Sequence, residues 1–367
     1  MNDLEILWSV QRIKEDIIMY NWKRKIEVWE YESDVFPKQK GVNWSIKDSA
    51  NDSYKTEHKD LEITFFQLLL STAKSMLTKS YKYSTQVALF ARSYSEVIQL
   101  LLDDKDGYLA FNYDFRDILR DFSKVTRHGE IAQGINYFYA KERLGAYAVF
   151  DFKDYARRAG ISKKCRGYTP DYVYCRSKDK AIGILESKGT MQATPTGFLI
   201  HGHDQCTNGE AYLKSHGIIP ANSYVSAVSF GTTSPRMHRH TRIYIADPSN
   251  KFEYKDENPK ENSLYEYSKL FYLAGNRRIT EKLMWGETIQ KSDFEFLESS
   301  FVNNGVIIGE WDVKDPFTNR MARINLGIKS SLADCLTGEN DVLQEYEHRI
   351  LENREEFSDG TFIVMED

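Results

Sequence analysis

Apolar residues recur at the three- and four-residue spacing of a helix through much of the first and last thirds of the chain. This spacing predicts helices over residues 1–30, 61–79, 84–102, 130–142, 204–215, 264–274, 280–284, 291–299 and 330–354. Runs of β-branched and aromatic residues predict strands over residues 146–152, 172–175, 181–185, 224–230, 242–246, 305–309 and 360–364. From residue 130 the order is helix, three strands, helix and two strands, which predicts a mixed sheet flanked by helices, an α/β fold.

This pattern divides the chain into three predicted regions. We expect a mainly helical N-terminal region over residues 1–124, an α/β core over residues 125–250, and a mainly helical, acidic C-terminal region over residues 251–367. The chain has 367 residues, 41% hydrophobic and 28% charged, which is typical of globular proteins. No apolar run approaches the roughly 20 residues that span a membrane. Four cysteines and a start that lacks the pattern of a signal peptide indicate a reducing, cytoplasmic setting.

Charge is unevenly distributed although the net charge is only −5. Residues 153–188 carry ten Lys or Arg against four Asp or Glu, whereas residues 333–367 carry eleven Asp or Glu against two Arg. The basic segment is compatible with a phosphate-binding groove, and the acidic segment with a restraint lying over that groove. Two solvated faces would explain the same charges, and the sequence leaves both interpretations open.

Candidate chemistry lies in Pro170-Asp171 and in Glu186-Ser187-Lys188. Asp171 opens the second predicted strand of the core, and Glu186 and Lys188 follow the third. Residues two apart in a strand point to the same side, so the two polar ends can converge on one spot. If the two strands form a hairpin, Asp171 lies beside that spot. Two carboxylates and an ammonium suit Mg²⁺- or Mn²⁺-assisted phosphodiester hydrolysis, with Asp171 and Glu186 as ligands and Lys188 acting on the water and transition state.

This motif, Pro-Asp followed after fourteen residues by Glu-Ser-Lys, resembles that of the PD-(D/E)XK nucleases, the restriction-endonuclease-like superfamily. The resemblance covers roughly residues 125–250 and agrees with the predicted order of elements. It implies an endonuclease in restriction, repair or antiviral defence, and it favours DNA over RNA as the substrate without deciding between them. It also implies an accessory catalytic role for Glu130, in the first turn of the preceding helix, and for Gln205, in the following helix.

Further residues are candidates for contact with nucleic acid because they are basic and flank the motif. They are Lys163, Lys164, Arg166, Arg236, Arg239 and Arg242. Three alternatives stay open: a nuclease-like module that binds nucleic acid or protein without cutting, a helical scaffold with a chance motif, and a zinc site built from His201, His203 and the nearby cysteines. The sequence also leaves an activating protein partner or a homo-oligomer open.

Overall fold

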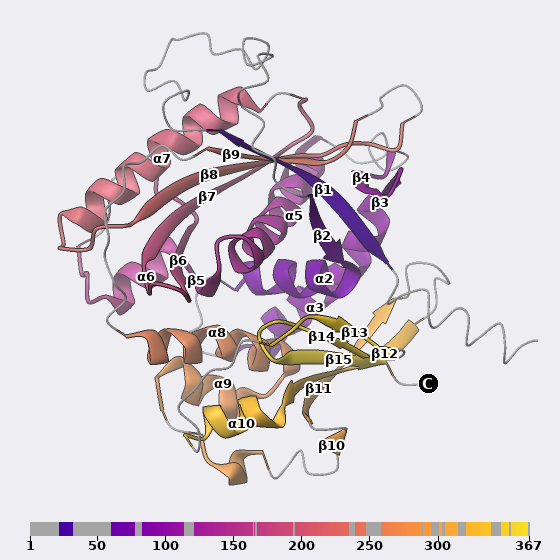
Figure 1. Cartoon of the computed structure of the whole chain (residues 1–367), viewed down its shortest axis with the longest axis vertical. Coiled ribbons are helices and arrows are strands. Elements are labelled where there is room, and N and C mark those ends of the chain that lie inside the picture. The colour runs from indigo at the N-terminus through magenta and orange to yellow at the C-terminus, as the bar shows by residue number, and fades with distance from the viewer. Residues whose placement is uncertain are drawn as a thin grey trace, which may run out of the picture.

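The computed structural model describes most of the chain in fifteen segments. They are residues 22–31, 60–77, 83–113, 121–163, 165, 167–193, 195–234, 239–246, 258–287, 289–294, 301–302, 305–314, 321–338, 346–351 and 354–365. Within them lie eight α-helices and two β-sheets, so the protein is a mixed α/β structure. The nine-stranded sheet occupies the upper part of Figure 1, and the smaller sheet the lower part.

The large sheet is mixed, with strand order β3-β4-β1-β9-β8-β7-β6-β5 and with β2 paired to β1. Its strands are β1 (Lys23–Tyr31), β2 (Leu61–Thr64), β3 (Leu102–Lys105), β4 (Tyr108–Phe111), β5 (Ala146–Asp151), β6 (Tyr172–Arg176), β7 (Ile182–Thr190), β8 (Asn222–Ser229) and β9 (Arg242–Ala246). Strands β5, β6 and β7 are antiparallel to one another, whereas β8 runs parallel to β7. The sheet therefore extends beyond the predicted core, because β1 to β4 come from the N-terminal region.

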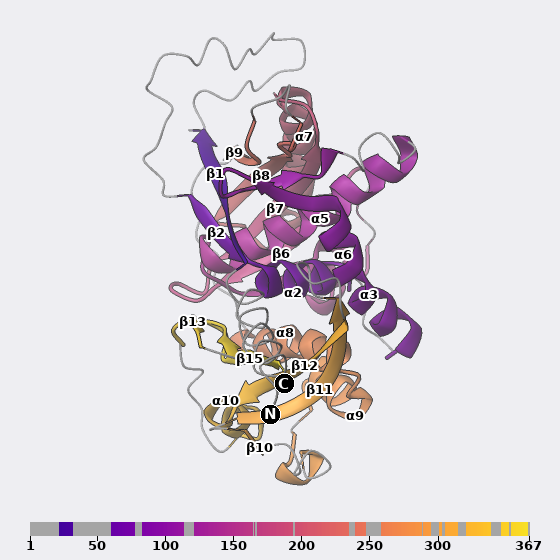
Figure 2. The same ribbon diagram turned by 90° about the vertical axis from the view of Figure 1, so that its right-hand side faces the viewer.

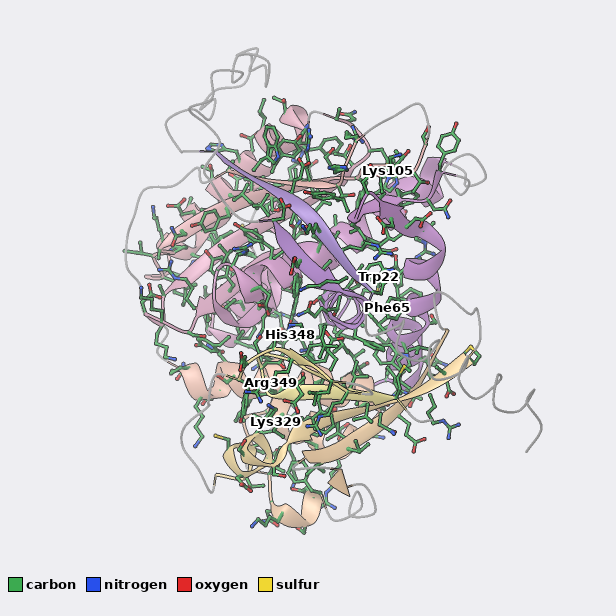
Figure 3. All side chains as sticks on the ribbon, turned by 45° about the vertical axis from the view of Figure 1, so that its right-hand side comes forward. Trp22, Phe65, Lys105, Lys329, His348 and Arg349 are labelled. Carbon is green, nitrogen blue, oxygen red and sulfur yellow. The ribbon has the colours of Figure 1, made fainter. Side chains whose placement is uncertain are left out.

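Helices cover both faces of this sheet. They are α2 (Phe65–Ser75), α3 (Thr85–Leu101), α5 (Asp121–Glu142), α6 (Phe152–Arg158) and α7 (Thr196–Lys214). The turned view of Figure 2 shows α2 and α3 between the large sheet and the lower part of the molecule. Trp22, which precedes β1, packs edge-on against Phe65 at the start of α2, with ring centroids 6.0 Å apart (Figure 3). In the described segments no helix is long and apolar enough to cross a membrane.

The C-terminal part is built on a six-stranded antiparallel sheet. Its strands are β10 (Phe301–Val302), β11 (Gly305–Lys314), β12 (Met321–Lys329), β13 (Arg349–Ile350), β14 (Arg354–Glu356) and β15 (Thr361–Met365). It is accompanied by α8 (Pro259–Ala274), α9 (Arg277–Met284), α10 (Ser330–Leu336) and the 3₁₀ turn η3 (Lys291–Asp293). The prediction of a mainly helical C-terminal region is therefore wrong, although the helices near residues 264–274 and 280–284 and the strands near 305–309 and 360–364 are confirmed.

Two predicted helices are replaced by strands. Residues 23–30 of the helix predicted over residues 1–30 belong to β1, where buried Ile26 and Val28 alternate with the more exposed Lys25 and Glu27. Residues 1–21 and the loop predicted over residues 32–59 lie outside the described segments. The helix predicted over residues 330–354 ends at Leu336, and β13 and the start of β14 occupy its end. In β1 the apolar residues that fit a helical period are buried by sheet pairing instead, whereas Ile350 of β13 is exposed.

Two acidic residues of the C-terminal segment that the structure describes, Glu355 and Glu356, pair with residues of the fold. Glu355 is buried and accepts hydrogen bonds from Thr64 at 2.6 Å and from His348 at 2.9 Å. Glu356 pairs with Lys329 at 2.8 Å and with Arg354 at 2.9 Å. These carboxylates join strands and helix ends of the two sheets, so the predicted restraint by this segment has no support in its described residues.

A buried carboxylate, Glu266, holds α8 against the large sheet. Its side chain accepts hydrogen bonds from the Tyr137 hydroxyl of α5 and from the Val149 backbone N–H of β5, the latter at 3.3 Å. Lys269, one turn later in α8, donates to the Val149 carbonyl and lies 3.4 Å from Glu266. One helix of the C-terminal part is thus bonded to a strand and a helix of the core.

Two more lysines complete this cluster. Lys74 of α2 and Lys141 of α5 lie 3.9 Å and 3.8 Å from Glu266, and Lys74 also lies 3.4 Å from Asp359 before β15. Burial alone would raise the pKa of Glu266, but attraction to Lys269, Lys141 and Lys74 lowers it to about 2. Burial lowers the pKa of Lys269 despite the attraction of Glu266. The charged form of Lys269 is therefore disfavoured, whereas the charged form of Glu266 is favoured. The charges of the cluster are balanced only while Glu266 is ionised.

We expect Glu266→Gln to lower the free energy of unfolding at neutral pH by on the order of 3 kcal/mol, because it leaves buried lysines without a counter-charge. The pKa of Glu266 is lower in the folded chain, about 2, than its usual 4.5. Its ionised form therefore stabilises the fold fully above pH 4.5, and this contribution is lost as the pH falls toward 2. The difference between variant and wild type should shrink over that range in denaturant unfolding measured at a series of pH values.

The matched control is Glu261→Gln, which removes an exposed carboxylate from the first turn of the same helix. It should change the free energy of unfolding by less than about 0.5 kcal/mol. A Glu266→Gln difference that stays constant over the acidic range would contradict the role assigned to the ionised carboxylate.

Candidate functional site

The hairpin of β6 and β7 brings the two predicted carboxylates together. Tyr172 pairs with Leu185 in the antiparallel register, so Asp171 and Glu186 face each other one residue further on. The backbone N–H of Asp171 donates to Glu186 Oε2 at 2.9 Å, and the backbone N–H of Ser187 donates to Asp171 Oδ2 at 3.0 Å. Opposite residues of an antiparallel pair point to the same face, so the two side chains share one side of the sheet.

Lys188 and Gln205 complete the group. The Lys188 ammonium bonds Glu186 Oε1 and donates to Gln205 Oε1 at 2.5 Å. Gln205 Nε2 donates to the Thr169 carbonyl at 3.0 Å, and His201 Nδ1 lies 2.9 Å from Gln205 Oε1. The predicted accessory residue Gln205 therefore connects the lysine to the loop that ends at Asp171. The predicted position of Glu186 and Lys188 after the strand is wrong, however, because β7 continues to Thr190.

Helix α7 fits closely over this face because two of its residues have no side chain. A Cβ on Gly202 would lie 2.4 Å from Val225 Cγ1 and 3.2 Å from Glu186 Cγ. A Cβ on Gly209 would lie 2.5 Å from Pro170 Cδ. Glycines seven residues apart lie on one helix face. They let α7 approach both the β7 strand and the loop before Asp171, which fixes the two carboxylates relative to Gln205.

Burial dominates the electrostatics of the pair. Burial raises the pKa of Asp171 to about 6, against the attraction of Lys188. Burial and then repulsion by Asp171 raise the pKa of Glu186 to about 8, although Lys188 opposes both effects. Two carboxylates held together in a site that one ammonium does not balance favour a further cation beside them.

Asp151 and Lys153 also act on this site, and the sequence analysis did not select either as a site residue. Asp151 ends β5 and caps α6 by accepting from the Asp154 backbone N–H at 2.9 Å. The Phe152 backbone N–H donates to the Asp171 carbonyl at 2.9 Å. The Asp151 carboxylate raises the pKa of Asp171 and the Lys153 ammonium lowers it. An aspartate between a strand and a helix is a recognisable N-cap signal, but only the pairing of β5 with β6 brings it close to Asp171.

Glu130 does not join the group. The helix α5 begins at Asp121, so the prediction that Glu130 lies in its first turn is wrong. Glu130 accepts from Arg127 at 2.8 Å and from the Tyr94 hydroxyl of α3. Asn136 of the same helix donates to Ser187 at 2.7 Å. Because Ser187 points away from the face shared by its neighbours in the strand, α5 covers the opposite side of the sheet.

The basic residues predicted to contact nucleic acid are only partly described. Lys164, Arg166 and Arg236 lie outside the described segments. Arg242 pairs with Glu27 of β1 at 2.6 Å, and Arg239 donates to the Met191 carbonyl at 2.6 Å. These two arginines stabilise β9 and the loop before it, because their guanidinium groups bind other residues of the protein. Lys163 is exposed, and its contact with nucleic acid stays a prediction.

The donor set fits a hard divalent cation. Asp171 and Glu186 offer carboxylate oxygens, which Mg²⁺ and Mn²⁺ prefer, and Mg²⁺ commonly takes one or two carboxylates together with waters and phosphate oxygens. No group of three His, Cys, Asp or Glu side chains that could hold a metal occurs in the described part of the chain, so the zinc alternative gains no support there. None of the four cysteines forms a disulfide, and Cys175 and Cys206 are buried.

We expect Gly202→Ala to lower the free energy of unfolding by about 1–3 kcal/mol, because the added methyl group forces α7 away from β7 and β8. Gly197→Ala is the matched control. It lies in the first turn of the same helix with nothing within 4 Å of an added Cβ, and it should stabilise by about 0.5–1 kcal/mol. Thermal and denaturant unfolding measure both changes. Equal effects of the two substitutions would show that the close approach at Gly202 is unimportant.

Comparison with known proteins gives no relative from which a role could be transferred. No model of a protein family matches the chain. No curated protein and no solved structure matches it either. The function is therefore argued from the geometry of the site.

Proposed function

We propose that this protein is a metal-dependent nuclease that hydrolyses phosphodiester bonds, with DNA as its preferred substrate. The observation that carries the proposal is the meeting of Asp171, Glu186 and Lys188 on one face of the β6–β7 hairpin. Two carboxylates and one ammonium that are held together away from water contribute little to the stability of the fold. The same three groups are those that phosphodiester hydrolysis requires.

Each residue has a defined part in this proposal. Asp171 and Glu186 hold Mg²⁺ or Mn²⁺, which when bound lowers the pKa of a coordinated water and offsets phosphate charge. Lys188 places a compact positive charge where negative charge develops on the phosphate oxygens. Gln205 is a positioning residue, because its carbonyl oxygen accepts from the Lys188 ammonium and its amide is fixed to the Thr169 carbonyl.

The surrounding fold supports a restriction-endonuclease-like core. The order α5, β5, α6, β6, β7, α7, β8 contains the helix, three strands, helix and strand that the resemblance implies, with the short helix α6 inserted between β5 and β6. Asp171 lies directly before β6, and Glu186 and Lys188 lie within β7, so the motif residues meet on adjacent strands. We place the activity in the cytoplasm, in restriction, repair or antiviral defence, with an activating partner or a homo-oligomer as a means of control.

We expect Asp171→Asn, Glu186→Gln and Lys188→Met each to reduce cleavage by at least about 100-fold, because each removes a metal ligand or a charge on the transition state. Asp171→Asn should unfold no earlier than wild type, since it removes the repulsion between two buried carboxylates. Cleavage of plasmid, linear duplex, single-stranded DNA and RNA is measured with Mg²⁺, with Mn²⁺ and with a chelator.

Glu130→Gln is the matched control, because this carboxylate pairs with Arg127 and Tyr94 on the opposite side of the sheet. It should keep cleavage within about threefold of wild type. Wild-type cleavage by the Glu186→Gln protein would refute the site. Metal-independent binding of nucleic acid without cleavage of any substrate would favour the binding-module alternative.

A further inference from the structure

A cavity of about 480 Å³ opens beside the site, between α6, the following loop and α7. Its apolar walls include Phe152, Ala156 and Ile161, all buried. Tyr212 of α7 supplies an aromatic wall, with its ring centroid 6.0 Å from that of Phe152. Its hydroxyl donates to the Lys163 carbonyl at 2.5 Å, which fixes the loop that closes the cavity. The volume lies within the roughly 300–1,000 Å³ of small-molecule sites.

Positive side chains surround this apolar space. Lys153, Arg157 and Lys163 contribute to its lining, and all three are exposed to solvent. Arg157 also bonds Asp154 at 3.2 Å, so part of its charge is offset. Lys153 lies in α6, and Lys163 lies in the loop that follows α6. An apolar, aromatic space with ammonium groups around it suits a planar base carried on phosphates.

The cavity is connected to the site by direct contacts. Phe152 forms its wall and donates its backbone N–H to the Asp171 carbonyl. A Cβ on Gly209 would meet both Phe152 and Pro170, so the cavity wall and the loop before Asp171 pack on one point of α7. The Lys153 ammonium, which lines the cavity, acts electrostatically on Asp171. An occupant of the cavity is therefore close to the two carboxylates.

We propose that this cavity receives the base of an unpaired nucleotide next to the scissile phosphate, so that the enzyme acts on single-stranded or frayed nucleic acid. This inference rests on the proposed function. A base in a duplex is covered by its stacking neighbours and its pairing partner, and it must leave the stack to enter a cavity in the protein. Tyr212 and Phe152 replace the stacking surface, and Lys153 and Lys163 neutralise the flanking phosphates. A free nucleotide carries the same base and phosphate as an unpaired nucleotide within a strand. Competition between adenosine monophosphate and the oligonucleotide distinguishes these two ligands.

The test measures binding and cleavage separately. Binding is followed by fluorescence anisotropy of a labelled single strand and of the same strand in a blunt duplex, with the Asp171→Asn protein in chelator. The single strand should bind about tenfold more tightly than the duplex. Ile161→Trp fills the cavity and should reduce binding of the single strand about tenfold while leaving that of the duplex unchanged. The double variant Lys153→Gln, Lys163→Gln changes only exposed positions. It should also reduce binding of the single strand, and it leaves the core unchanged.

Lys178→Gln is the matched control, since this exposed lysine lies in the turn at the far end of the β6–β7 hairpin. It should leave the affinity for the single strand unchanged. Metal-dependent cleavage by the wild type together with equal affinity for strand and duplex, insensitive to the cavity variants, would overturn the cavity inference and leave the nuclease intact. Binding of millimolar adenosine monophosphate that the cavity variants abolish, with oligonucleotide binding unaffected by the same variants and by added adenosine monophosphate, would assign the cavity to a free nucleotide and overturn the inference equally. Loss of all cleavage would count against the proposed function alone.

Discussion

The ionised Glu266 is the constraint on which the arrangement of the two sheets depends. It is buried in α8, yet it contacts α5 and β5 of the core and approaches lysines from α2 and α5. Lys74 extends the cluster to Asp359 beside β15. Because a buried carboxylate is tolerated only with its counter-charges in place, α8 can settle on the core in one position. The end of β5, which leads into the site, is fixed by the same contacts.

The pKa values of the buried carboxylates Glu266 and Glu186 are shifted in opposite directions. Attraction to three lysines outweighs burial and lowers the pKa of Glu266 to about 2. At the candidate site the pKa of Glu186 is raised to about 8, because burial and the repulsion of Asp171 exceed what Lys188 offsets. The first arrangement stabilises the fold. The second arrangement places two repelling carboxylates next to a cavity with positively charged residues around it. This contrast is the physical reason for proposing a catalytic role for the cluster of Asp171 and Glu186 and a structural role for the cluster of Glu266.

Prediction from sequence succeeded where local pattern and burial agree. Strands β5, β6, β8 and β9 are apolar and short, and their periodicity survives in the structure. The motif residues Asp171, Glu186 and Lys188 were found because a hairpin fixes which side chains share a face. Prediction failed for β1 and for the described residues 346–351, whose apolar residues also fit a helical spacing. It failed for Glu130 because the start of α5 has no clear capping signal, and the helix begins nine residues earlier.

The sequence by itself determined the α/β character, the hairpin and the three charged residues that meet in it, because these depend on strand alternation and on separations of a few residues. Only the tertiary structure decided what surrounds them. The approach of α7 through Gly202 and Gly209, the contact of Gln205 with Lys188, and the cavity between α6 and α7 join segments separated by loops whose path no local pattern specifies. The same holds for Glu266, whose partners come from three other elements and whose ionisation is favourable only when all of them are assembled.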